Sequence, residues 1–215
     1  GELPAAAAGL SLPMGTLFAL PEGVSGVYLT ARTQVTWRDL LEQFEQGSTL
    51  VVALVMLRRQ AGARKWALGK RLSVDSCFLL PVAHCDDGYS LGVLGYRGSP
   101  SEVLDRAEQV GDLLLCDVVV GESLGGPRRF LHVAAVVFSD PETQQVVVAE
   151  CPPDPDLQTG LQDLGCTEGT EGKTAVQHGS FSDHFRSLLC EVAVLHGGRG
   201  GRGRSLFERG LAGKA

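Results

Sequence analysis

The sequence predicts an α+β protein, in which a mixed, mainly antiparallel sheet is built from hairpin-plus-helix units and the helices pack on the sheet. Two observations support this class. Apolar runs rich in β-branched residues alternate with amphipathic segments. Three times, a predicted hairpin is followed by a capping residue, an amphipathic helix and a glycine, and the three predicted caps are Thr36, Ser99 and Asp154. The 215 residues, 44% of them hydrophobic, are enough for a sizeable core.

The first predicted unit covers residues 15–71. Residues 15–20 and 26–31 are expected to be strands around a turn. Thr36 is expected to cap a helix, because apolar residues recur after it at the spacing of one helix face. Those residues are Trp37, Leu40, Leu41 and Phe44. Residues 49–57 are almost all β-branched or aliphatic, which predicts a strand buried on both faces.

The central unit, residues 72–126, begins with a predicted hairpin. Residues 77–83 form an apolar run, and residues 89–96 resume as a glycine-containing strand. The Asp-Asp-Gly sequence at residues 86–88 supplies turn chemistry between them. We therefore expect two adjacent antiparallel strands.

The helix of the central unit has clear start signals. Ser99 is the predicted N-cap, Pro100 occupies the first helical position, and Glu102 completes a capping box. Gly111 is expected to end the helix. Residues 112–121 form a second apolar run, which predicts a closing strand.

The third unit, residues 127–197, repeats this order. Residues 130–138 and 144–150 are expected to pair as a hairpin around a Ser-Asp-Pro-Glu turn. Asp154 is expected to cap the next helix, and a final helix is expected within residues 182–197.

The predicted domain organisation is a flexible lead-in at residues 1–14, one α+β domain at residues 15–197, and a disordered Arg/Gly tail at residues 198–215. The three units are either true internal repeats or parts of one continuous sheet, and the second interpretation is favoured. The net charge of −6 argues against a general nucleic-acid-binding body.

The six cysteines include no C-x-x-C pair, and several lie in apolar runs. Such residues are typical of reduced, buried thiols, so an intracellular location in the cytoplasm or nucleus is favoured. No apolar stretch is long enough to span a membrane, and no membrane partner is expected. The histidines and cysteines lack the spacing of a zinc site, so neither a metal nor another cofactor is predicted.

The one candidate for nucleophilic chemistry is Cys85, which follows His84 at the end of a predicted strand. Adjacent residues on a strand point to opposite faces, so His84 is poorly placed to activate the thiol. Another base would have to come from elsewhere in the chain: His132, His178 or His184. A structural role for Cys85 is therefore favoured.

Two basic segments are candidate binding sites. The first contains Arg58, Arg59, Arg64, Lys65 and Trp66, and the second contains Arg199, Arg202 and Arg204. The first segment is either a patch for nucleic acid or an acidic partner with a stacking tryptophan, or a solvated loop that its tryptophan anchors to the core. The second is either an RNA-binding tail or a linker. The anchored loop and the linker are the favoured interpretations.

The central unit also resembles a known superfamily. Its residues 78–83, the following Asp-Gly turn, the motif Gly92-x-x-Gly95-Tyr96 and the helix from Val103 to Val110 are similar to the SUKH superfamily, in its betaherpesvirus US-twenty-two-like branch. The resemblance implies an α+β sheet fold without a catalytic centre. It also implies a protein-binding role, as in immunity proteins, cell-wall signalling scaffolds and viral antagonists of host defence.

The leading hypothesis is therefore a non-enzymatic protein–protein interaction module, of the viral host-defence antagonist or immunity type. The alternative is a cysteine-dependent hydrolase or transferase that uses Cys85. A third hypothesis is an RNA-associated protein that binds through the Arg/Gly tail.

Overall fold

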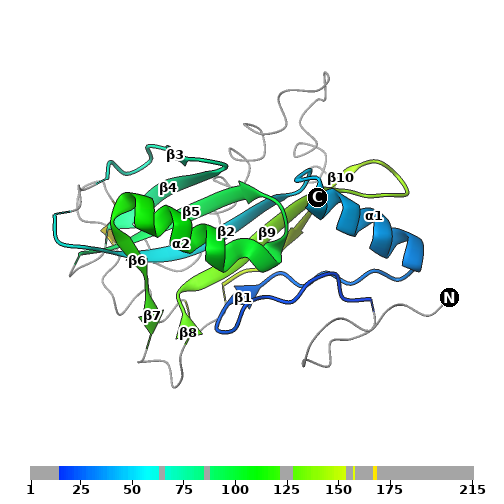
Figure 1. Ribbon diagram of the computed structural model, residues 1–215, viewed down its shortest axis with the longest axis horizontal. Coiled ribbons are helices and arrows are strands. Elements are labelled where there is room, and N and C mark those ends of the chain that lie inside the picture. Colours follow the sequence, from blue (N-terminus) through cyan, green and yellow to red (C-terminus); the bar gives the residue numbers. More distant parts are fainter. Residues whose placement is uncertain are drawn as a thin grey trace, which may run out of the picture. The chain divides into compact units, whose positions relative to one another are not determined.

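The computed structural model describes residues 15–62, 66–84, 88–121, 128–153, 157 and 167–168, all within the compact unit Gly1–Val176. Nine described strands form one sheet, whose main path is β1-β9-β2-β5-β4-β11 (Figure 1). The strands of this sheet are β1 (Ser25–Gly26), β2 (Leu50–Arg59), β3 (Leu72–Val74), β4 (Cys77–His84), β5 (Tyr89–Arg97), β6 (Cys116–Val118), β9 (Leu131–Ser139), β10 (Val146–Glu150) and β11 (Thr167–Glu168). A separate ribbon consists of β7 (Val120–Gly121) and β8 (Arg128–Arg129).

The predicted α+β class is confirmed. Every pairing in the described sheet is antiparallel except that of β1 with β9. The helices are α1 (Gln34–Glu45) and α2 (Val103–Leu114), and a short 3₁₀ turn, η2 (Pro100–Glu102), leads into α2. Strands from all three predicted units pair in this one sheet, which agrees with the interpretation as one continuous sheet.

Strand β2 lies in the middle of the sheet and uses both of its edges. One edge pairs with β5 along nearly its whole length. The other edge pairs first with β9 and then with β6. The side chains from Val51 to Leu57 are at most 2% exposed, which confirms the prediction of a strand buried on both faces.

Both helices contribute to the core on one face of the sheet, and α2 runs across that face (Figure 1). Leu40 and Phe44 of α1, and Val103, Ala107 and Val110 of α2, belong to the same cluster as the odd-numbered residues of β2. On the opposite face the even-numbered residues Val52, Leu54 and Met56 are buried as well.

The N-cap of helix α1 lies three residues before the predicted cap. Thr33, with φ of −128°, is the N-cap, and its side chain accepts a hydrogen bond of 3.1 Å from the Thr36 amide. The prediction of Thr36 as the cap is therefore wrong, because two threonines at this spacing both fit the sequence signal. The predicted apolar face is confirmed, since Leu40 and Phe44 are buried.

The segment before α1 is mostly irregular, so the prediction of strands at residues 15–20 and 26–31 is wrong. Only an isolated bridge joins Thr16 to Thr30, and β1 is two residues long. At Gly26, with φ of +140°, a Cβ would lie 2.2 Å from the backbone oxygen of Val133. The close approach of β1 to β9 therefore requires glycine at this position.

The start of α2 follows the prediction, but its end does not. Ser99 and Glu102 form the predicted capping box at η2. The helix then continues through Gly111 and ends at Leu115, a C-cap with φ of 55°. A Cβ at residue 111 would lie 2.6 Å from the backbone oxygen of Cys116, so Gly111 allows close packing and does not end the helix.

Because α2 ends later than predicted, the segment after it also differs from the prediction. The predicted strand at residues 112–121 is replaced by the last turn of α2 and the short strands β6 and β7. The hairpins β4–β5 and β9–β10 are confirmed, whereas β3 was not predicted. The helix expected from Asp154, the final helix, the lead-in and the tail lie almost wholly outside the described residues.

Replacement of Gly95 by Ala should destabilise the fold strongly. The ring of Phe78 lies over Gly95, and a Cβ there would be 2.0 Å from the Phe78 Cζ. We expect Gly95→Ala to lower the free energy of unfolding by about 2 kcal/mol or more in urea denaturation. Phe78→Leu in the same chain should recover part of this loss, whereas strictly additive effects would contradict the proposed clash.

The cap of α2 should also be measurable by denaturation. Ser99→Ala removes the hydroxyl that accepts a hydrogen bond from the Ser101 amide, and we expect a loss of about 1 kcal/mol in the free energy of unfolding. Ser73→Ala, at an exposed position of β3, is the matched control and should change stability little. Equal losses in the two variants would argue against a capping role for Ser99.

Candidate functional site

The predicted nucleophile site at the end of β4 is only partly described. The His84 Nδ1 atom lies 3.1 Å from the Ser90 Oγ, and its Nε2 lies 3.0 Å from the Trp66 carbonyl oxygen. Because a carbonyl only accepts, Nε2 carries the hydrogen, and both ring nitrogens are engaged in internal bonds. Cys85 lies outside the described residues, so a reactive Cys85 stays a prediction.

A second histidine, His132, has a similar environment that the sequence did not reveal. Its Nδ1 lies 2.8 Å from the Ser25 Oγ, and its Nε2 lies 2.9 Å from the Cys151 carbonyl oxygen. The side chain is 1% exposed. Strand β9, which carries His132, is three strand spacings from β4, or about 14 Å, so His132 is too far from the end of β4 to serve as its base.

The described thiols are in environments that disfavour the thiolate. Cys77 and Cys116 are buried free thiols, and Cys151 is partly buried. Burial raises the pKa of Cys116 to about 11, although the nearby Arg59 opposes this. Burial also raises the pKa of Cys77. Neither group is therefore prepared as a nucleophile near neutral pH.

The first predicted basic segment is divided between β2 and the loop that follows it. Arg58 is exposed and its guanidinium lies 5.8 Å from the centre of the Tyr89 ring. The Nε of Arg59 is buried without a hydrogen-bond partner in the described residues. Trp66 is 9% exposed and packs in the core, so it offers no open ring face for stacking and it anchors the loop.

The remaining residues of the two basic segments are not described. Arg64, Lys65, Arg199, Arg202 and Arg204 all lie outside the described residues. A binding role for these five residues stays a prediction.

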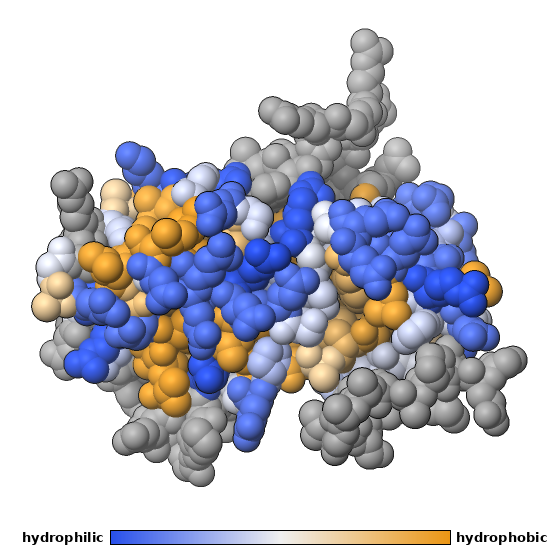
Figure 2. All heavy atoms as spheres, viewed as in Figure 1, coloured by the Kyte–Doolittle hydropathy of each residue, from blue (hydrophilic) through white to orange (hydrophobic). Residues whose placement is uncertain are grey.

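Three exposed apolar side chains lie within eight residues of sequence, from the C-terminal end of α2 to β7. Leu113, Leu115 and Val120 are 59%, 52% and 49% exposed, and we call them the apolar end surface. Figure 2 shows hydrophobic surface over the C-terminal end of α2, β6 and β7. This surface was not predicted, because the sequence places Leu113 and Leu115 in an expected strand that begins directly after Gly111.

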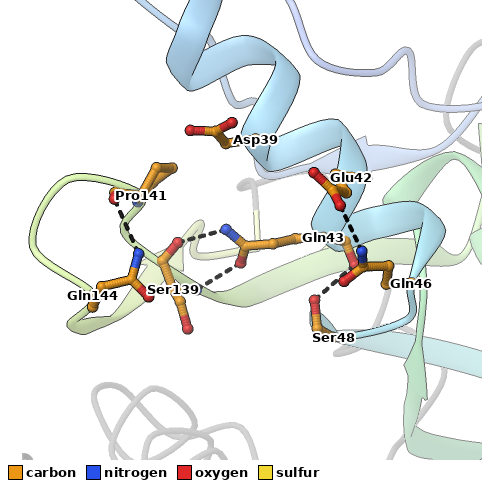
Figure 3. A pocket seen from close by; sticks show the side chains of 8 residues that line it. All are labelled: Asp39, Glu42, Gln43, Gln46, Ser48, Ser139, Pro141 and Gln144. Carbon is orange, nitrogen blue, oxygen red and sulfur yellow. Dashed lines mark hydrogen bonds between the residues drawn. The ribbon is translucent and has the colours of Figure 1, made fainter.

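A polar groove of about 330 Å³ lies between α1 and the turn that joins β9 to β10 (Figure 3). Asp39, Glu42 and Gln43 line the helix side. Gln43 ties the two sides together, because its amide nitrogen donates to the Ser139 carbonyl at 2.8 Å and its amide oxygen accepts from the Ser139 backbone at 3.0 Å. Pro141 and Ser139 lie on the other side.

Among the described residues, no cluster of three or more histidine, cysteine or acidic side chains is arranged to hold a metal ion. Nor does any helix in the described part of the chain have both the length and the apolar character required to cross a bilayer.

Comparisons with known proteins give little guidance. No protein-family model and no curated protein matches this chain. Among solved structures, the chain is similar to "Human RNA Pseudouridylate Synthase Domain Containing 1", with 19% sequence identity and a TM-score of 0.49. The similarity covers 81% of this chain and 79% of that chain.

The environment of Cys116 predicts slow alkylation. A pKa raised from 9.0 to about 11 leaves less thiolate at any pH below this value, so the thiolate fraction near pH 8 is about a hundredfold lower than for an ordinary thiol. We expect Cys116 to react with iodoacetamide more slowly than free cysteine added to the same solution, as measured by mass spectrometry. Denaturation of the chain should abolish the difference, and rapid labelling of native Cys116 would contradict this description.

Proposed function

We propose that this protein is a protein-binding module and that the apolar end surface docks a partner protein. The proposal rests on three apolar side chains within eight residues of sequence. Leu113, Leu115 and Val120 are each about half exposed. Large apolar side chains gathered on a surface are typical of protein interaction sites. Burying a leucine fully contributes about 1.5–3 kcal/mol, so two half-exposed leucines provide a substantial driving force.

The backbone supports the presentation of Leu115. This residue has the left-handed conformation, with φ of 55°, which costs a non-glycine residue on the order of 1 kcal/mol. Its carbonyl accepts a hydrogen bond of 2.9 Å from the Gln60 amide, which connects the end of α2 to the segment after β2. The surrounding structure therefore holds an apolar side chain toward solvent at a cost in stability.

The charges beside the apolar end surface suggest the chemistry of the partner. Asp112 and Asp117 are exposed next to it in sequence, and Glu108 is exposed one turn earlier on α2. Glu108 is paired with Arg129, whereas Asp117 accepts a hydrogen bond from the neutral Gln60 side chain. A partner with an apolar patch and basic residues at its rim would be complementary, and its association would be slowed by salt.

The resemblance of the central unit to the SUKH superfamily implies the same broad class. Members of that superfamily include immunity proteins and viral antagonists of host defence, and this finer assignment is part of our proposal. The resemblance does not identify the partner. We expect the partner to bind at the apolar end surface.

Two substitutions test the surface while preserving its backbone. Leu113→Gln keeps a good helix former, and Leu115→Asn places a residue that tolerates the left-handed conformation at the C-cap. The double variant should fold normally and bind the partner about tenfold or more weakly, because it removes the apolar contacts. Val35→Gln, at an apolar position of α1 that is 68% exposed, is the matched control.

The partner is first found by placing a photoreactive residue at position 113, with position 35 as the reference, in the native cells. We expect a protein that cross-links from position 113 only and whose purified form binds the Val35→Gln chain normally. Equal cross-linking from both positions, or unchanged affinity in the Leu113→Gln/Leu115→Asn chain, would falsify the proposed docking surface.

A further inference from the structure

The groove between α1 and the β9–β10 turn has two carboxylates without a cationic partner. Asp39 and Glu42 are one helical turn apart on α1, so their side chains are neighbours on the same side of the helix. Glu42 accepts a hydrogen bond of 2.7 Å from the neutral Gln46 side chain, and Asp39 has no hydrogen bond or ion pair with the described residues. Figure 3 shows both carboxylates near the opening between the helix and the turn.

The described residues that line the turn side of the groove are uncharged, and a third carboxylate, Asp140, lies in the turn beside it. Asp140 begins the turn, where it accepts hydrogen bonds from the Glu142 amide and the Thr143 hydroxyl. These bonds lower the pKa of Asp140 from its ordinary value, so this carboxylate stays ionised to lower pH. Among the described residues, no basic side chain lines the groove. Figure 2 likewise shows a hydrophilic surface over α1.

Strand β10 begins at the same turn, and one of its edges is not paired with any described strand. It pairs with β9 over all five of its residues, from Val146 opposite Ser139 to Glu150 opposite Ala135. No other described strand pairs with β10. Natural edge strands are usually protected by lysine, proline or a bulge, whereas β10 begins with three valines and carries its only charge at Glu150.

We propose that β10 and the adjacent groove together bind an extended segment of a partner protein, which adds a strand to the sheet and places a basic side chain between α1 and the β9–β10 turn. The strand edge supplies main-chain hydrogen bonds, and the groove supplies a charge-selective contact. Antiparallel addition is the more stable arrangement, so the segment runs toward Val146 and its basic residue follows the paired stretch.

The charge of the groove selects this occupant. A nucleic-acid phosphate would be repelled by Asp39 and Glu42, whereas arginine can bridge these two neighbouring carboxylates through its planar guanidinium. An acidic segment would meet the same repulsion. The proposal therefore commits to a basic, extended protein segment, and it is independent of the apolar end surface.

The test uses the full chain and a fluorescent peptide, Thr-Val-Thr-Val-Thr-Gly-Arg with an amide C-terminus, in a binding titration at low salt. We expect saturable binding that is lost when the arginine is replaced by glutamate or when the edge-facing amides of the peptide are N-methylated. Equal binding by either altered peptide would overturn the proposal, because it requires both the charge and the strand pairing.

The matching variants locate the site. Asp39→Asn with Glu42→Gln should weaken peptide binding about fivefold, the size expected for two partly exposed ion pairs. Asp105→Asn with Asp112→Asn makes the same change in net charge on α2 and should leave the affinity unchanged. The proposal is overturned if both double variants lose affinity equally. It is also overturned if Leu113→Gln/Leu115→Asn abolishes peptide binding, since the peptide would then occupy the apolar end surface.

Discussion

The backbone of β2 is hydrogen-bonded along both edges while its side chains are buried on both faces. Pairing with β5 on one edge and with β9 and β6 on the other joins segments that are far apart in the sequence. An eight-residue stretch without a charged side chain can occupy this position because strands pair with it along both edges. The core beneath α1 and α2, and the positions of both proposed binding surfaces, depend on this central strand.

The sequence predicts the parts of the fold that rest on local chemistry. Buried strands such as β2 have an apolar run, and the start of α2 has a capping box, so both were recognised. The errors arose where one local signal fits more than one structure, as with the caps Thr33 and Thr36. Gly111 matched a helix-stop signal, yet its role depends on the backbone of Cys116, which packs against it only after folding.

The candidate sites show the same division. The sequence identifies Trp66 as either a stacking residue or a core anchor, and only its burial in the folded chain distinguishes the two. The apolar end surface was not predicted, because the predicted end of α2 was Gly111 and the observed helix continues to Leu114. Asp39 and Ser139 line the same groove although they are one hundred residues apart in sequence. No local sequence pattern predicts that two such residues lie close together. Residues at such surfaces follow no periodic rule, because solvent accepts almost any side chain there.

During synthesis on the ribosome, β2 is made well before the strands that pair with it. Its β5 edge is completed after about 40 more residues, but its β9 edge must wait for about 80, since Leu50 pairs with Val137. At typical synthesis rates this interval lasts several seconds, during which an apolar strand has an open edge. Nascent chains at this stage are therefore the form most exposed to mispairing with one another, and the β9 segment completes the protection of β2 as well as its packing.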